Sequence, residues 1–314
     1  MIKKWIITFC TISSMCSVYG WNASGHMTAG AVAYYYLQQH DPIALQKVLH
    51  ALQQHPWYGT VWADSIKAQG WQGADADIAL FMYASTYSDD VRKIPELGGP
   101  ERAKWHYVDL PFVPFGQKVT GQPAEDPNAE GMLHAWLTNI PAMQDGPERA
   151  TDICWFFHVL EDVHQPLHTV SMFTEKLPDG DRGGNDVYVI RPKGDTVKLH
   201  YLWDSPLRLK PAEVPSLAKE LLGEKKYRYD KMKETCDQIG NTITEKDIDS
   251  WIADESFMLA KDVVYASGDI HGTKETPSVL SKKYMKAFQE TAERRIVVSG
   301  IRLALILSQM FQAQ

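Results

Sequence analysis

Apolar residues recur every three or four positions along most of this 314-residue chain, and this spacing restricts its fold more than any other feature. It places apolar side chains on one face of an α-helix. The pattern predicts helices over residues 26–39, 42–54, 77–87, 129–137, 148–163, 214–222, 227–239, 245–265 and 278–311. Ser24 and Asp41 are the expected N-caps of the first two, with Pro42 at the first helical position of the second.

One region departs from this pattern. The runs Val187–Ile190 and Thr196–Leu199 are β-prone and flank Pro-Lys-Gly-Asp, which predicts a short hairpin. The range 98–128 is rich in Pro and Gly and is expected to be loop. No internal repeat or shift in composition marks a boundary. We therefore expect an all-α, mainly helical fold with one short β-hairpin, forming a single domain over residues 21–314.

The first 20 residues have the layout of a secretory signal peptide. Lys3 and Lys4 precede an apolar run, and Val18 and Gly20 are small residues suited to a cleavage site. The alternative is an uncleaved anchor, but the run is shorter than a span and Thr11 interrupts it. No later stretch is expected to cross a bilayer. We expect cleavage after Gly20, a secreted or periplasmic monomer, and Trp21 as the first residue of the mature chain.

Cleavage would leave two cysteines, Cys154 and Cys236. In an oxidising compartment they could form a disulfide, or they could be two separate buried thiols. The sequence leaves both alternatives open.

The formal net charge of −7 gives no sign of a basic surface for nucleic acid. An anionic substrate must therefore be attracted by something other than Lys and Arg. A cluster of bound cations is one such source of positive charge.

Histidines and carboxylates repeat at helical spacing in the centre of the chain. His158 and Asp162 are four residues apart in CWFFHVLEDVHQPLH, and His200 and Asp204 repeat this spacing in HYLWD. Residues four apart on a helix share a face and can reach one cation. Pro166 ends the first helix and lets His168 turn back toward it. Imidazole and carboxylate in these proportions suit zinc.

Two further candidates lie in apolar surroundings. Asp64 lies in VWAD and His106 in KWHYVD. An unpaired carboxylate in such a setting is costly, so a cation partner is expected. His26 lies five residues after the expected new N-terminus.

Together these residues resemble the secreted zinc-dependent single-strand nucleases, which share a fold with the bacterial zinc phospholipases C. The resemblance runs from Trp21 through WAD, WHYVD, HVLEDVHQPLH, DRGGN and HYLWD to SGIRLALIL. It implies three zinc ions. The implied ligands are Asp64, His106, His158 and Asp162 for the first zinc, His168, His200 and Asp204 for the second, and Trp21, His26 and the shared Asp162 for the third. Trp21 would bind through its free α-amine and its carbonyl, so processing would have to come first.

The resemblance also implies the chemistry. Zinc-activated hydroxide would attack phosphorus in single-stranded DNA or RNA and leave 5′-phosphorylated products, with possible 3′-nucleotidase activity. Lys67, three residues after Asp64, matches a basic residue that would stabilise phosphate charge, and Asp64 itself is a candidate for a catalytic role.

The implied base pocket contains Tyr107 for stacking and Asp109 for the base edge. Asn185 matches a second base contact, and Gly183-Gly184 would let the backbone approach closely. Arg182 departs from the small apolar residue expected at its position and could stack on a base. Tyr107 and Asp109 could instead be ordinary core and surface residues. His164 matches no ligand and is expected to hydrogen-bond near the zinc ligands.

Two other functions stay open. A zinc phospholipase C would share the metal scaffold but would have Glu at the position of Asp204. A non-catalytic zinc-binding protein would keep the ligands but would need no phosphate-binding lysine. The ligand pattern together with Asp109 and the Gly-Gly-Asn run favours the nuclease.

Overall fold

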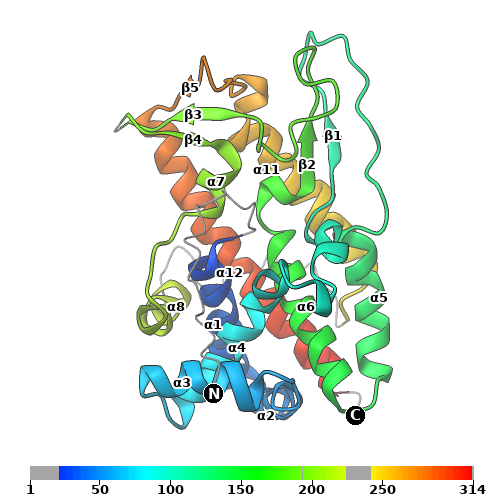
Figure 1. The fold of residues 1–314 in the computed structure, drawn as a ribbon, viewed down its shortest axis with the longest axis vertical. Helices are drawn as coiled ribbons and strands as arrows, with labels where there is room; N and C mark the ends of the chain where they lie inside the picture. The colour runs from blue at the N-terminus through cyan, green and yellow to red at the C-terminus, as the bar shows by residue number, and fades with distance from the viewer. Residues whose placement is uncertain (1–20, 193, 224–241, 313–314) are drawn as a thin grey trace, which may run out of the picture.

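The computed structural model describes residues 21–192, 194–223 and 242–312, and these are mostly helical (Figure 1). The segment expected to be a signal peptide, the helix expected at 227–239 and Cys236 lie outside them. The α-helices are α1 (Ala23–His40), α2 (Pro42–Leu52), α3 (Ala63–Gln69), α4 (Ala74–Val91), α5 (Ala129–Ala142), α6 (Pro147–Asp162), α7 (Leu199–Asp204), α8 (Val214–Gly223), α10 (Glu245–Ser250), α11 (Phe257–Leu259) and α12 (Lys282–Gln312).

Shorter helical turns join these elements. Three are π-helical: η1 (Tyr58–Trp62), η6 (Trp251–Ser256) and η7 (Ala260–Val264). Five are 3₁₀ helices: η2 (Pro95–Leu97), η3 (Pro100–His106), η4 (Pro166–Thr169), η5 (Pro211–Glu213) and η8 (Ala266–Gly268). The helix expected over 245–265 is therefore helical throughout but alternates between α and π turns.

Two small sheets lie at one end of the molecule (Figure 1). Strands β1 (Leu110–Phe112) and β2 (Val170–Met172) pair in parallel. Strand β3 (Tyr188–Ile190) pairs antiparallel with β4 (Thr196–Lys198) and parallel with β5 (Ser278–Val279). The predicted hairpin is confirmed as β3–β4. The predicted loop over 98–128 was partly wrong, because it contains η3 and β1.

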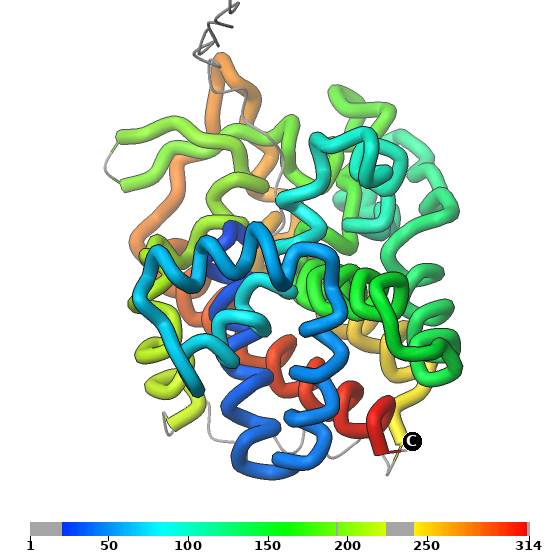
Figure 2. The backbone as a smooth tube through the Cα atoms, turned by 60° about the horizontal axis from the view of Figure 1, so that its bottom comes forward, coloured from blue at the N-terminus to red at the C-terminus, as the bar shows by residue number. Residues whose placement is uncertain are grey.

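Helix α1 is central, and its residues are buried around most of its circumference. Two glycines explain how closely its neighbours pack. A Cβ on Gly300 of α12 would lie 2.5 Å from the carbonyl oxygen of Ala29 in α1. A Cβ on Gly30 of α1 would lie 2.7 Å from the carbonyl oxygen of Phe81 in α4. Helices α12 and α4 can therefore approach α1 from two sides (Figure 2).

The N-cap of α1 is Asn22, whose side chain accepts a hydrogen bond from the amide of Gly25. Ser24, the predicted cap, lies inside the helix, and its hydroxyl donates a hydrogen bond to the carbonyl of Leu209. The helix therefore starts earlier than predicted and reaches the buried Trp21. Asp41 caps α2 as predicted.

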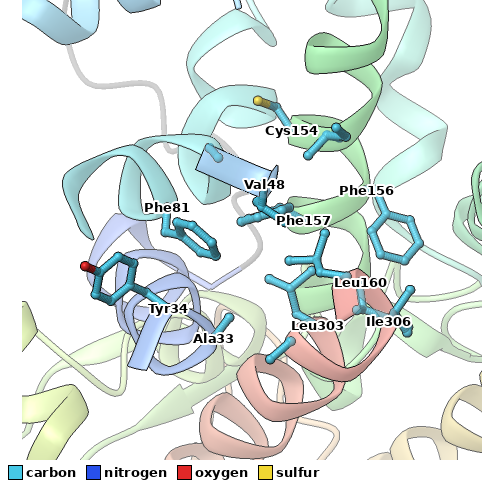
Figure 3. Close-up of a cluster of buried hydrophobic side chains, with 14 of the residues drawn as sticks. Ala33, Tyr34, Val48, Phe81, Cys154, Phe156, Phe157, Leu160, Leu303 and Ile306 are labelled. Atoms are coloured by element: carbon cyan, nitrogen blue, oxygen red, sulfur yellow. The ribbon is translucent and has the colours of Figure 1, made fainter. Parts of the chain in front are cut away.

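The apolar core forms where α1, α4, α6 and α12 meet. Figure 3 shows Phe81, Phe157, Leu160, Leu303 and Ile306 converging there. Cys154 is buried in the same cluster, and within the part of the chain that the structure describes its thiol forms no disulfide.

Helix α12 was not expected to be able to cross a bilayer, yet among the described residues it is the one helix long and apolar enough to do so. In its most apolar 18-residue window, 78% is buried inside the molecule. Its apolar side chains are thus accounted for by the packing against α1, α2 and α6.

Candidate metal centre

Three groups of His and carboxylate side chains meet where the C-terminal end of α6 lies against α1, α4 and α7. The groups are His26, His158 and Asp162; Asp89, His106 and His158; and His168, His200 and Asp204. Within each group, possible ligand atoms all lie within 4.8 Å of one another. Eight residues from six segments of the chain are thus brought into neighbouring sites.

Asp162 is the centre of this arrangement and is fully buried. Its Oδ2 lies 3.0 Å from Nδ1 of His106 and 3.1 Å from Nε2 of His158. Its Oδ1 lies 3.4 Å from Nε2 of His26 and 3.6 Å from Nδ1 of His168. One carboxylate therefore faces four histidines.

The second group closes around Asp204 on α7. Nε2 of His200 lies 3.3 Å from its Oδ2, and Nε2 of His168 lies 3.9 Å from its Oδ1. The amide of Gln165 donates a 2.6 Å hydrogen bond to Asp204 Oδ1 and fixes its orientation.

Three of the histidines are oriented by backbone carbonyls. In each of them Nδ1 donates a hydrogen bond of 2.6 to 2.7 Å to a backbone carbonyl. His158 bonds the carbonyl of Ser85, His168 bonds the carbonyl of His106, and His200 bonds the carbonyl of Gly183. Each bond leaves Nε2 directed at the acidic groups. Gly183 can serve because a Cβ there would lie 2.4 Å from the carbonyl of Leu167, so only glycine fits.

The electrostatics of the site call for cations. Burial raises the pKa of Asp204 well above its usual value. Burial, with the nearby charge of Asp162, raises the pKa of Asp89 to about 6. Burial lowers the pKa of His158, but the charges of Asp162 and Asp89 outweigh it and raise that pKa to about 10. Buried carboxylates in this number are stable only when positive charge compensates them.

Several buried polar atoms here have no hydrogen-bond partner. They are Nε2 of His26, His106 and His168, Oδ1 of Asp162 and Oδ1 of Asp89. Buried polar atoms are normally paired, so atoms left open and aimed at one place are what metal ligands provide. The donor set of imidazole and carboxylate fits zinc.

Asp64 and Lys67 are not brought to this centre, which corrects the expectation for both. Both side chains are exposed on α3, which lies near the lower end of the molecule in Figure 1, whereas α7 lies in its upper half. Lys67 lines a separate cavity with Tyr58 and Trp71.

Asp89 on α4 lies where Asp64 was expected. Its Oδ1 lies 3.8 Å from Nε2 of His158, and Nη1 of Arg92 lies 3.8 Å from that same oxygen. Asp89 and Arg92 are three residues apart, the same spacing as Asp64 and Lys67. The sequence spacing is therefore compatible with either pair as the Asp and the basic residue of the site. Only the packing of α4 against α6 shows that Asp89 and Arg92 are the pair at this centre.

Trp21 begins the described chain beside this centre. It is fully buried, and its indole N–H donates to the carbonyl of Glu161. The amide of Asn22 donates a 2.7 Å hydrogen bond to the carbonyl of Asp204. The chain at Trp21 and Asn22 is thus attached to the end of α6 and to α7, a short distance before His26.

His164 does not contact the ligands, contrary to expectation. Its Nδ1 donates to the carbonyl of Leu160, and its Nε2 lies 2.9 Å from Nη1 of Arg302. It belongs instead to a network with Arg302 of α12 and the partly buried Glu255 of η6.

Three of the four predicted base-binding residues line one cavity of about 200 Å³: Tyr107, Asp109 and Arg182. Arg182 has a positive φ of 54°, and its guanidinium makes two hydrogen bonds to Asp186 at 2.8 and 2.6 Å. Asn185 is buried and donates to the carbonyl of Arg182, so it holds the turn that presents Arg182. Burial and the charge of Asp181 raise the pKa of Asp109 to about 6.

Comparison with known proteins identifies relatives across the whole chain. A family model described as S1/P1 Nuclease matches residues 21–312. Endonuclease 3 of Arabidopsis thaliana is 21% identical, covering 100% of this chain and 97% of the relative. Endonuclease 5 of the same plant is 26% identical, and the match covers 100% of this chain and 98% of the relative. Endonuclease 1 is 30% identical over about half of each chain, 49% and 47%.

Proposed function

The chain belongs to the S1/P1 nuclease family and is therefore a nuclease, and we propose that it cleaves single-stranded DNA and RNA to 5′-phosphorylated products with three zinc ions. One observation carries this proposal. Three His and carboxylate groups adjoin one another at Asp162, and buried ligand atoms of His26, His106, His168, Asp89 and Asp162 have no hydrogen-bond partner.

The residues present divide among three zinc sites. Asp89, His106, His158 and Asp162 would hold the first, and His168, His200 and Asp204 the second. Trp21, His26 and the shared Asp162 would hold the third. Bound zinc supplies Lewis acidity and lowers the pKa of water toward neutrality.

The third site requires a free α-amine on Trp21, so the proposal includes signal cleavage after Gly20 and export of the chain to the periplasm or the medium. The burial of Trp21 supports this assignment, as does the bond from Asn22 to Asp204. Together, the burial of Trp21 and this hydrogen bond keep the first residues of the proposed mature chain close to the acidic groups.

Asp89 and Arg92 take the roles first assigned to Asp64 and Lys67. Asp89 would be a ligand through Oδ1, and the half-buried guanidinium of Arg92 would attract and orient the phosphate. A planar, permanently charged guanidinium at the metal centre suits a phosphodiester oxygen.

The cavity beside Tyr107 would account for a preference for single strands. A base can enter it only if it has left its stack, and Tyr107 then offers an aromatic face while Asp109 bonds the base edge. Arg182, held by Asp186, lines the same cavity.

Cleavage of a fluorescent single-stranded oligonucleotide by the processed protein tests the proposal. We expect cleavage with 5′-phosphate ends, loss of activity in chelator and recovery with Zn²⁺, and much slower cleavage of the matched duplex. Hydrolysis of phosphatidylcholine without cleavage of DNA would indicate a phospholipase C instead. Stable zinc binding without turnover of either substrate would indicate a non-catalytic zinc protein.

A further inference from the structure

Glu161 lies directly before the shared ligand Asp162 on α6, but its side chain points toward α1 and α4. It is fully buried. Its Oε2 lies 2.7 Å from Nδ1 of His26, and its Oε1 accepts a 2.7 Å hydrogen bond from the hydroxyl of Ser85. Both carboxylate oxygens are therefore occupied, so Glu161 is placed to orient a ligand rather than to be one.

His26 differs from the other oriented histidines in its partner. His158, His168 and His200 donate Nδ1–H to backbone carbonyls, whereas His26 faces a carboxylate. A carboxylate accepts a stronger hydrogen bond than a neutral carbonyl. With Nδ1 turned to Glu161, Nε2 of His26 is directed at Oδ1 of Asp162, 3.4 Å away.

Ser85 connects this pair to a second ligand. Its hydroxyl donates to Glu161, while its carbonyl accepts from Nδ1 of His158. The imidazoles of His26 and His158 are stacked with ring centroids 4.0 Å apart. Ser85 and Glu161, bonded to each other, thus hold the two stacked rings through their Nδ1 atoms.

The contact between Ser85 and Glu161 depends on a glycine in α1. A Cβ on Gly30 of α1 would lie 2.4 Å from the hydroxyl oxygen of Ser85. Any larger residue there would displace the serine from Glu161. The close packing of α1 on α4 therefore also keeps Ser85 within reach of the carboxylate.

We propose that Glu161, held by Ser85, is a positioning residue that fixes the tautomer and orientation of His26 and so raises the affinity of the third site for zinc. This inference rests on the proposed three-zinc function. Carboxylates behind metal-binding histidines fix the ring and increase its basicity, and their loss lowers metal affinity by roughly 10- to 100-fold.

The test measures zinc per chain for wild type, Glu161→Gln, Glu161→Leu and Ser85→Ala after equilibration in zinc buffers of increasing chelator strength. Glu161→Gln keeps a hydrogen-bonding group but removes the charge, so we expect its third zinc to bind roughly 10-fold more weakly, and that of Glu161→Leu roughly 100-fold. The other two zinc ions should stay bound. Ser88→Ala is the matched control, since Ser88 is buried on the same helix and its hydroxyl has no hydrogen-bond partner.

A second readout does not depend on the leucine variant folding. In ¹⁵N spectra of the zinc-loaded wild type, His26 should carry its proton on Nδ1, and Ser85→Ala should shift this resonance while Ser88→Ala does not. Unchanged zinc affinity in the Glu161 variants, or equal loss of all three ions, overturns this inference but leaves the nuclease proposal standing. A processed wild-type chain that holds only two zinc ions overturns both.

Discussion

Asp89 and His158 face each other across the packed helices α4 and α6, with Oδ1 of the aspartate 3.8 Å from Nε2 of the histidine. The side chain of Asp89 is only 10% exposed. This relationship makes Asp89, rather than Asp64, the carboxylate that completes the group with His106.

Asp89→Asn should therefore lower kcat/KM on single-stranded DNA by at least roughly 100-fold, because it removes a charged ligand. Asp64→Asn should stay within about twofold, because that side chain is exposed on α3. Initial rates with an oligonucleotide substrate compare the two. Equal loss in both variants, or loss in Asp64→Asn alone, would contradict the assignment.

A chain that retains two extra residues before Trp21 should bind one zinc fewer than the processed chain. Its α-amine is displaced from the buried position next to His26, and no other group replaces it. Metal analysis by mass spectrometry of both forms, with N-terminal sequencing, checks the count. Three ions in the extended chain would show that the α-amine is not a ligand.

Base binding should weaken as the pH falls through about 6. Burial and the charge of Asp181 raise the pKa of Asp109 to about 6, and protonation removes the carboxylate that accepts from a base N–H. KM for a single-stranded substrate should rise below this pH, and Asp109→Asn should have a high KM that is nearly independent of pH over the same range. A wild-type KM that does not change between pH 5 and 7 would contradict the role of Asp109.

Glu255→Gln should destabilise the fold by about 3–5 kcal/mol, because it leaves the buried cations Arg295 and Arg302 without their shared carboxylate. Urea unfolding measures the change, and Asp254→Asn, on the exposed neighbour, is the control that should lie within about 0.5 kcal/mol of wild type.

The same carboxyl predicts a pH dependence of stability. Burial alone would raise its pKa, but the two arginines lower it to about 2 from its usual value of 4.5. A lowered folded-state pKa stabilises the fold above the unfolded value, so this contribution is full above about 4.5 and is lost as the pH falls toward 2. Wild type and Glu255→Gln should therefore converge in stability over that window.

The longer helices were predictable from the sequence because their apolar spacing is regular, as in α1, α4 and α6, whereas the short helices α3 and α7 were not predicted. The His and Asp residues of α6 and α7 were predictable because both pairs repeat one helical spacing. Asp89 was missed because its surroundings in the sequence, Ser-Asp-Asp-Val-Arg, do not distinguish it from Asp64. The choice depends on which helix packs against α6, and that is a tertiary property.

Other misses have the same cause. The role of Glu161 is not predictable from the sequence, because adjacent helix positions point to different faces and only the approach of α1 and α4 brings Glu161 to His26. His164 was expected near the ligands for its position in the motif, yet the turn after α6 directs it to Arg302. Short-range patterns identify which residues are available, and helix packing determines which of them meet.

A crystal structure of the processed protein with data collected at the zinc absorption edge tests the central claim most directly. The anomalous map should show three zinc peaks beside Asp162, one of them contacted by Asp89 and one by the α-amine of Trp21. Fewer peaks, or a peak contacted by Asp64, would contradict the account.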